Sequence, residues 1–198
     1  MTLSSFYQPE ELEEMGLLIY GRDVKISRMA QIYGAQRIAV GNSVRIDDFV
    51  VLTSGSDGEV RIGNHVHIAA HAALFGGGGI ILEDFTSLSG RVSVYSATDG
   101  YGGEALTNPT VPSQYTSVLK APVVLRRHSL VGAASVLLPG VTLDEGCAVG
   151  AMSLVNRDLA SWGLYVGVPA RRIRDRSQAL LEMERGLLED EARGINLG

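Results

Sequence analysis

Aliphatic residues recur every six positions through most of this chain, and this period constrains the fold more than any other feature. The recurring residues, called anchors here, are Tyr20, Ile26, Ile32, Val40, Ile46, Leu52, Ile62, Ile68, Leu74, Leu82, Leu88, Val94, Leu125, Val131, Leu137, Leu143, Val149 and Val155. Four residues after most anchors stands a small or β-branched side chain, such as Val66 or Ala72. A sustained hexapeptide repeat is typical of a solenoid. Each set of three anchors predicts one triangular coil whose short strands pair in parallel with the next coil.

The period also predicts which side chains face the interior. Anchors and the small residues four positions later should point inward, and the third and fifth residues after each anchor should point outward. Cys147 then belongs to the core as a packing residue. His65 and His67 should project from one face of their coil, and His71 should stack on Phe49 of the coil below.

Several segments interrupt or flank the repeat. The largest interruption spans residues 99–124 and is rich in glycine, proline, tyrosine and polar residues. Long loops inside compact domains are usually functional. Before the repeat, Gln8 to Met15 predicts a short helix that ends at Gly16, and residues 177–192 predict a terminal helix that caps the end of the solenoid. We therefore divide the chain into a lead-in (1–19), the solenoid domain (20–174) and a helical tail (175–198).

The bulk composition excludes several classes of function. A formal charge of −5 and a pI near 5.4 argue against a nucleic-acid surface. The sequence has no apolar run of membrane-spanning length, and its first ten residues lack the features of a signal peptide. A single cysteine excludes an internal disulfide and suits a reducing compartment. We expect a protein of the cytoplasm that neither inserts into membranes nor binds nucleic acid.

Three stretches of the sequence resemble the hexapeptide-repeat acyltransferases. Residues 40–49 (VGNSVRIDDF) and 62–69 (IGNHVHIA) look like coils of that family, and residues 122–173 look like its C-terminal half, ending in VGVPARRI at 166–173. The long loop also lies where sugar and xenobiotic acetyltransferases insert theirs. The resemblance implies an all-β, left-handed parallel β-helix, a homotrimer, and acetyl-CoA sites between neighbouring subunits.

The resemblance also implies which residues bind the cofactor. Small residues such as Ala133 and Ala151 would let the pantetheine chain approach the backbone. Arg171 and Arg174 match positions where sugar acetyltransferases place arginines that contact coenzyme A, and Asn156 and Arg157 follow a corresponding coil. Arginine suits phosphate because its paired donors fit phosphate oxygens. The alternative is that the small residues only fit the turns and that the arginines only form a solvated surface. His128 is a further residue that could contact the cofactor.

The catalytic base is harder to assign. Related O-acetyltransferases have a histidine at the opening of the long loop, and here that position is Asp99. An aspartate is a weak general base for a hydroxyl. His67 and then His71 are the alternative bases, although for either histidine taken singly a surface or interface role is the more common one.

The missing histidine favours an amine acceptor, because an amine that binds neutral attacks a thioester without a strong protein base. We expect the acceptor to be an amino sugar, most simply a nucleotide-linked one, with the hydroxyl of a glycan as the alternative. Asp99 would then bind the ammonium or a sugar hydroxyl. The loop residues expected to contact the sugar are Tyr101, Glu104, Asn108 and Tyr115.

Three other functions fit the same repeat. One is a sugar O-acetyltransferase of the galactoside type. A zinc carbonic anhydrase is a second, but it needs three histidines around the metal, and His71 stands one position away from that family's pattern. The third is a solenoid without catalytic activity, which leaves the 99–124 loop and the terminal arginines unexplained. We expect no metal.

Overall fold

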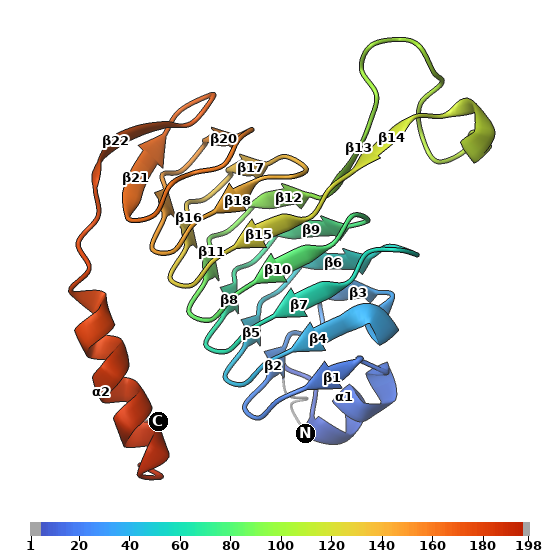
Figure 1. Cartoon of the computed structure of the whole chain (residues 1–198). Helices are drawn as coiled ribbons and strands as arrows, with labels where there is room; N and C mark the ends of the chain where they lie inside the picture. The colour runs from blue at the N-terminus through green and yellow to red at the C-terminus, as the bar shows by residue number, and fades with distance from the viewer. Residues whose placement is uncertain (1–4, 196–198) are drawn as a thin grey trace.

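The computed structural model describes residues 5–195 as a triangular β-solenoid. Three parallel sheets form its walls, and each is named here after its first strand (Figure 1). The β1 sheet contains β1 (Ile19–Tyr20), β4 (Ile38–Val40), β7 (Val60–Ile62), β10 (Ile80–Leu82), β15 (Val123–Leu125) and β18 (Thr142–Leu143). The β2 sheet contains β2 (Lys25–Ile26), β5 (Arg45–Ile46), β8 (His67–Ile68), β11 (Ser87–Leu88), β16 (Leu130–Val131), β19 (Ala148–Val149), β21 (Gly163–Val166) and the antiparallel β22 (Arg171–Asp175). The β3 sheet contains β3 (Gln31–Tyr33), β6 (Val51–Ser54), β9 (Ala73–Gly76), β12 (Ser93–Tyr95), β17 (Val136–Leu137) and β20 (Leu154–Val155).

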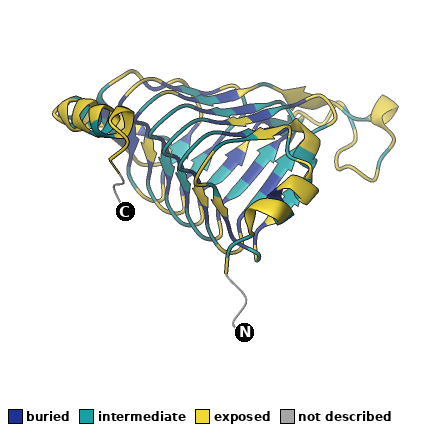
Figure 2. Ribbon diagram, turned by 90° about the horizontal axis from the view of Figure 1, so that it is seen from below, coloured by how far each residue is buried: buried dark blue, intermediate teal, exposed yellow. Residues whose placement is uncertain are grey.

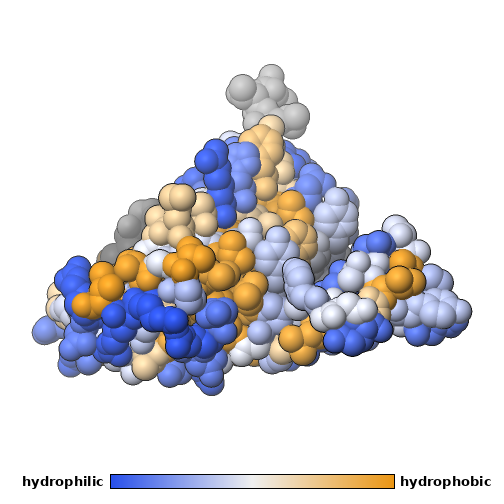
Figure 3. Space-filling model, turned by 90° about the horizontal axis from the view of Figure 1, so that it is seen from above, coloured by the Kyte–Doolittle hydropathy of each residue, from blue (hydrophilic) through white to orange (hydrophobic). Residues whose placement is uncertain are grey.

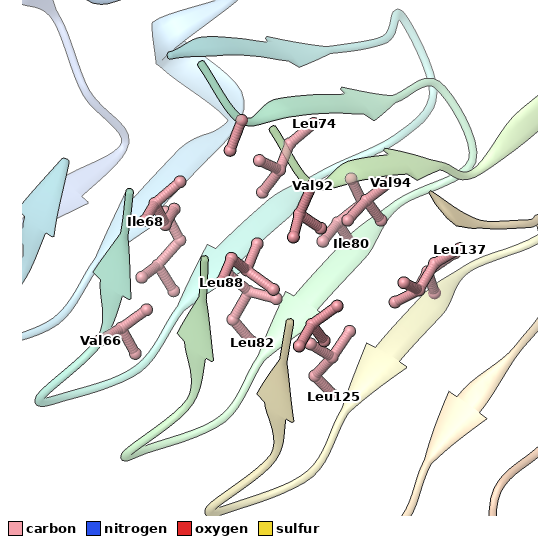
Figure 4. Packing of buried hydrophobic residues seen from close by; sticks show 14 of the residues in the cluster. Val66, Ile68, Leu74, Ile80, Leu82, Leu88, Val92, Val94, Leu125 and Leu137 are labelled. Carbon is pink, nitrogen blue, oxygen red and sulfur yellow. The ribbon is translucent and has the colours of Figure 1, made fainter. Parts of the chain in front are cut away.

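The buried side chains of the hexad repeat form a single core that runs along the solenoid axis. Leu82, Leu88 and Val94 belong to one coil and are almost fully buried, one on each sheet. Figure 4 shows these side chains meeting in the interior, with Leu125 and Leu137 of the next coil beside them. The small residues four positions after the anchors are buried as well, so the predicted inward register and the parallel coils are confirmed.

The turns between the sheets form three edges of the solenoid, which give it the triangular outline of Figure 3. The β2–β3 edge joins the β2 sheet to the β3 sheet, and the β1–β2 and β3–β1 edges are named in the same way. The third residue after an anchor often adopts a positive φ, as at Phe49 (59°), His65 (55°) and His71 (62°). These residues therefore lie on the edges. The prediction that His65 shares a sheet face with His67 is wrong, because His65 occupies the turn before β8.

The long interruption has a defined base. Strand β13 (Ala97–Asp99) pairs antiparallel with β14 (Val118–Lys120), and the 3₁₀ helix η2 (Ser113–Tyr115) lies in the segment between them. The segment projects from the β3–β1 edge, away from the solenoid (Figure 2). At its base, Lys120 Nζ donates to Asp57 Oδ2 at 2.7 Å and so links β14 to the turn before β7.

Helices flank both ends of the chain. Helix α1 (Pro9–Met15) ends at Gly16 in a left-handed conformation, as the sequence predicts, and the 3₁₀ helix η1 (Ala35–Arg37) follows β3. Helix α2 (Leu180–Ala192) differs from the prediction. It does not cover the last coil but packs alongside the β1–β2 edge (Figures 1 and 2), where its Glu184 and Glu191 contact His128 and His65. None of the helices in residues 5–195 is both long enough and apolar enough to cross a membrane.

Candidate functional site

The β2–β3 edge is a continuous ladder of turns. His71 N donates to Asp48 O at 3.1 Å, and Arg91 N donates to Ala70 O at 3.1 Å. In the next two coils toward the C-terminus, Ala134 N donates to Gly90 O at 3.0 Å, and Met152 N donates to Ala133 O at 2.8 Å. Each turn is thereby fixed about 4.8 Å above the one below it. The corresponding residues of successive turns are Phe49, His71, Arg91, Ala134 and Met152, and all of them have a positive φ.

This edge has two chemically different halves. Its upper half presents small residues, namely Gly90, Ala133 and Ala151, so a thin chain can lie close to the backbone there. Its lower half presents two rings and one arginine, with the Phe49 ring stacked on His71 at 4.9 Å between centroids and Arg91 one turn above. The predicted stacking of His71 on Phe49 is confirmed. The halves meet at residues 89–91, which connect β11 to β12.

His67 lies on the face of the β2 sheet and not on an edge. Strand pairing places it between Arg45 and Ser87. Its Nε2 is 2.8 Å from Asp47 Oδ2, and Arg45 Nε donates to Asp47 Oδ1 at 2.6 Å. Burial would raise the pKa of Asp47, but the hydrogen bonds from Arg45 and His67 outweigh it and lower that pKa. Asp47 therefore stays ionised and holds the His67 ring.

Asp99 lies at the end of β13, where the long loop begins. Its Oδ2 accepts a hydrogen bond from Asn108 N at 3.3 Å, which ties the carboxylate to the loop. Tyr101 is 94% exposed, and Glu104, Asn108 and Tyr115 are exposed as well. Within this one chain these loop side chains do not line a pocket with His67 or His71. They are available to a molecule, or to another chain, that approaches the loop.

The residues predicted to bind coenzyme A fall into two groups. Ala133 and Ala151 lie on the β2–β3 edge, and Arg171 begins β22 close to the top of that edge, because the preceding Ala170 N donates to Leu154 O. Arg174 is paired with Leu164 farther along the β2 sheet. Asn156 and Arg157 follow β20 and therefore lie on the β3–β1 edge, on the far side of the β3 sheet.

A second cluster lies where α2 packs on the β1–β2 edge. The rings of His65, Phe85 and His128 stack in succession, with centroids 4.7 and 5.1 Å apart, and Trp162 follows at 6.4 Å from His128. His128 Nε2 is 3.0 Å from Glu184 Oε2, and Arg127 also donates to Glu184. Side chains of α2 and of the edge line an open pocket of about 440 Å³ beside these rings. His128 is thus buried in the contact with α2, far from the small residues of the β2–β3 edge.

Neither the cysteine nor a cluster of metal ligands forms a catalytic centre within residues 5–195. Cys147 is fully buried, and burial raises the pKa of its thiol to about 12, so it packs in the core as predicted. Among residues 5–195, no three histidine, cysteine, aspartate or glutamate side chains group in a way that could hold a metal ion.

Solved structures of similar proteins fit this arrangement. An N-acyltransferase from Bacillus cereus, AntD, in complex with dTDP and 3-hydroxybutyryl-CoA is 44% identical, with a TM-score of 0.90 over 96% of this chain and 100% of that chain. A variant of the same protein, in complex with dTDP-4-amino-4,6-dideoxyglucose and coenzyme A, matches equally well over 95% of this chain and 99% of that chain. A hexapeptide-repeat acetyltransferase from Vibrio cholerae shares the fold at 18% identity, with a TM-score of 0.61 over 85% of this chain and 76% of that chain.

These relatives draw attention to a residue that the sequence analysis missed. The solved variants of the Bacillus cereus protein carry substitutions of one serine and of one aspartate ten positions after it. In this chain, Ser89 and Asp99 are the only serine and aspartate with that order and spacing. Ser89 follows β11 at the junction of the two halves of the β2–β3 edge. The hexad register gave no signal for it, because the residue after an anchor is assigned neither to the core nor to the surface.

Full-length sequence similarity identifies the family. No family model matches the chain. A dTDP-4-amino-4,6-dideoxy-D-glucose acyltransferase from Escherichia coli is 41% identical over 187 residues, which cover 94% of this chain and 96% of that protein. A similarity of this extent, together with the solenoid and its small-residue edge, argues against a solenoid with a purely structural role. The chain belongs to the hexapeptide-repeat acyltransferases and is an acyl-CoA-dependent enzyme of that family.

Proposed function

We propose that this protein transfers a short acyl group from acyl-CoA to the amino group of a dTDP-linked 4-amino-4,6-dideoxy sugar. The observation that carries the proposal is the 44% identity, over nearly the whole of both chains, to an N-acyltransferase bound to such a sugar and to coenzyme A. The aspartate at position 99 supports the same conclusion. It replaces the histidine of related O-acetyltransferases, and an amine acceptor does not need that base.

The chemistry is an aminolysis of a thioester. The neutral amine attacks the thioester carbonyl carbon, the new C–N bond forms, and the C–S bond breaks. The amine loses one proton, the coenzyme A thiolate takes up one proton, and the products are an amide and free coenzyme A. Ser89 and Asp99 are suited to orient the amine, because a hydroxyl and a carboxylate can both accept its N–H groups. The bound amine then needs only the geometry of attack.

The upper half of the β2–β3 edge suits the pantetheine chain. Gly90, Ala133 and Ala151 leave the backbone accessible on three successive turns, and Arg171 stands near the top, where the phosphates of coenzyme A would lie. The thioester would then lie near Ser89. His67, which pairs with Asp47 on the face of the β2 sheet, is the weaker choice among the predicted bases.

The position of Asp99 favours a site shared between subunits. Ser89 lies on the β2–β3 edge and Asp99 on the β3–β1 edge, with strand β12 between them. Strand β12 ends at Tyr95, and β13 leads away from the edge to Asp99; at about 3.3 Å per residue, the extended backbone from residue 93 to residue 99 spans up to roughly 20 Å. A single amine cannot contact both side chains of one chain. We infer a homotrimer in which the loop of one subunit brings Asp99, with Tyr101, Glu104, Asn108 and Tyr115, to Ser89 of its neighbour.

The activity is tested by measuring the release of coenzyme A thiol with a disulfide reagent. We expect turnover with dTDP-4-amino-4,6-dideoxyglucose and either acetyl-CoA or 3-hydroxybutyryl-CoA, and none with dTDP-6-deoxyglucose, which has a hydroxyl in place of the amine. Equal rates with the hydroxyl and the amine would overturn the proposal, as would the absence of turnover with both. Light scattering tests the assembly, since a trimer has about three times the 21.1 kDa mass of the chain. A monomer that retains full activity would refute the shared site.

A further inference from the structure

We propose that His71 and Arg91, on the lower half of the β2–β3 edge, bind the diphosphate of the nucleotide sugar, and that Phe49 positions His71 for this role. The inference rests on the proposed function, because it takes the acceptor to be a nucleoside diphosphate sugar. It assigns His71 to substrate binding and not to proton transfer.

The first argument is the charge and exposure of the ladder. His71 and Arg91 are both exposed, and in residues 5–195 neither has a carboxylate within ion-pair distance. Asp48, which precedes Phe49, forms no ion pair with either side chain within residues 5–195, and its Oδ1 accepts a hydrogen bond from the Ser27 hydroxyl in the coil below. Two neighbouring donors with free capacity suit a diphosphate, whose oxygens accept several charge-assisted hydrogen bonds.

The second argument is geometric. The hydrogen bond from Arg91 N to Ala70 O fixes Arg91 one turn above His71, a step of about 4.8 Å. Ser89, which we propose as a contact of the reacting amine, precedes Arg91 by two residues. In a 4-amino sugar the amine and the diphosphate leave opposite sides of one pyranose ring, a separation comparable with one such step. With the amine at Ser89, the diphosphate therefore lies beside Arg91 and His71.

The third argument concerns Phe49. Its ring stacks on His71 with an interplanar angle of 18°, although phenylalanine rarely adopts the positive φ that it has here. The stack restricts the plane of the imidazole, because the two rings lie nearly parallel. Phe49 is 47% exposed and does not belong to the buried core, so its ring is available to position His71 at the surface. Above Arg91 the ladder changes to alanine and methionine, so the cationic part of the edge ends where the pantetheine would begin.

The test is the equilibrium binding of dTDP, thymidine and coenzyme A to the full-length protein, measured by calorimetry. Arg91→Gln and His71→Gln should each weaken dTDP binding by about 10- to 100-fold, the loss expected for one charged hydrogen bond. Thymidine and coenzyme A affinities should change less than twofold. Arg22→Gln is the matched control, because Arg22 is an exposed arginine on the β1–β2 edge, and it should leave all three affinities unchanged.

Two further measurements distinguish a loss of diphosphate binding from a general loss of folded, active enzyme. In the acyl-transfer assay, Arg91→Gln should raise KM for the nucleotide sugar and leave kcat within about twofold, since it removes uniform binding. Phe49→Leu should weaken dTDP binding in the wild-type background but have little further effect in His71→Gln, because a positioning residue acts through the residue that it orients.

The outcomes distinguish this inference from the proposed function. If the wild-type enzyme acylates the amino sugar but neither Arg91→Gln nor His71→Gln changes dTDP affinity, the subsite is wrong and the function stands. An equal loss of thymidine affinity also overturns the subsite, because the phosphates would then not be what these residues recognise. If dTDP binding behaves as expected but no acyl transfer occurs, the function is wrong and the subsite stands.

Discussion

Gly146 offers a direct test of the packing on the β1–β2 edge. It lies between His128 and Trp162, its φ is +69°, and an added Cβ would lie 2.4 Å from two atoms of the Trp162 indole. Gly146→Ala should therefore incur two costs. A left-handed backbone costs alanine about 1–2 kcal/mol, and displacing the packed ring costs about 1–3 kcal/mol. The free energy of unfolding should fall by about 2–5 kcal/mol. For a chain of this length that corresponds to a decrease in Tm of roughly 4–20 °C.

Thermal unfolding at fixed protein concentration measures this change, and Gly186→Ala is the matched control. Gly186 lies within α2 and an added Cβ meets no atom within 4 Å, so alanine there should stabilise the protein by about 0.5–1 kcal/mol. In the double variant Gly146→Ala with Trp162→Ala, the clash is removed, and the combined loss should be smaller than the sum of the single losses. A Tm of Gly146→Ala within 1 °C of the wild type, or strict additivity in the double variant, would refute the reasoning.

Three further predictions follow from charges and burial. Burial, and then the charge of Arg127, lower the pKa of His128 below 6.5, so the unfolded chain takes up a proton that the folded chain does not as the pH falls. The free energy of unfolding should decline between about pH 7 and pH 5.5. In His128→Gln, the free energy of unfolding obtained from denaturant titrations should depend less on pH across that range; a pH dependence equal to that of the wild type would contradict this. Cys147 should resist iodoacetamide in the folded protein at about pH 8 and react once in denaturant, whereas rapid native labelling would contradict its burial. Asp57→Asn removes the exposed ion pair with Lys120 and should leave the midpoint of urea denaturation nearly unchanged, because exposed ion pairs contribute little to stability; a clear loss would indicate that the loop base supports the solenoid.

The hexad period predicted the core of this protein, because alternation inside and outside a strand is a local property of the sequence. Leu88 and the other anchors are buried where the period places them, and the stacking of His71 on Phe49 follows from adding one coil to another. The preference for an amine over a hydroxyl acceptor also came from one residue, Asp99, at a position where related enzymes have a histidine. The relatives, which are N-acyltransferases, support it.

The parts that the sequence did not predict depend on conformation at the turns. The period alone does not distinguish an outward strand residue from an edge residue, so His65 and His67 were assigned to one face although His65 has a positive φ. Ser89 has no signal in the period, because the residue after an anchor is assigned neither to the core nor to the surface. It came to notice only through the serine substituted in the Bacillus cereus relative.

The position of α2 depends on a match between the rise of the helix and the spacing of the coils. The sequence suggested a cap over the last coil, since several leucines lie near one face of the helix. Glu184 and Glu191 are seven residues apart, a rise of about 10.5 Å along a helix, and their partners His128 and His65 lie two coils apart, at about 9.6 Å. Two helical turns thus match two coil steps, so the glutamates meet turns of the edge that lie two coils apart, and Leu187 between them lines the same pocket as Phe85 and Leu130. A cap over the last coil would bury only the leucines. The match of spacings buries the apolar side chains and also pairs the glutamates with histidines, and it explains why the helix runs back along the solenoid.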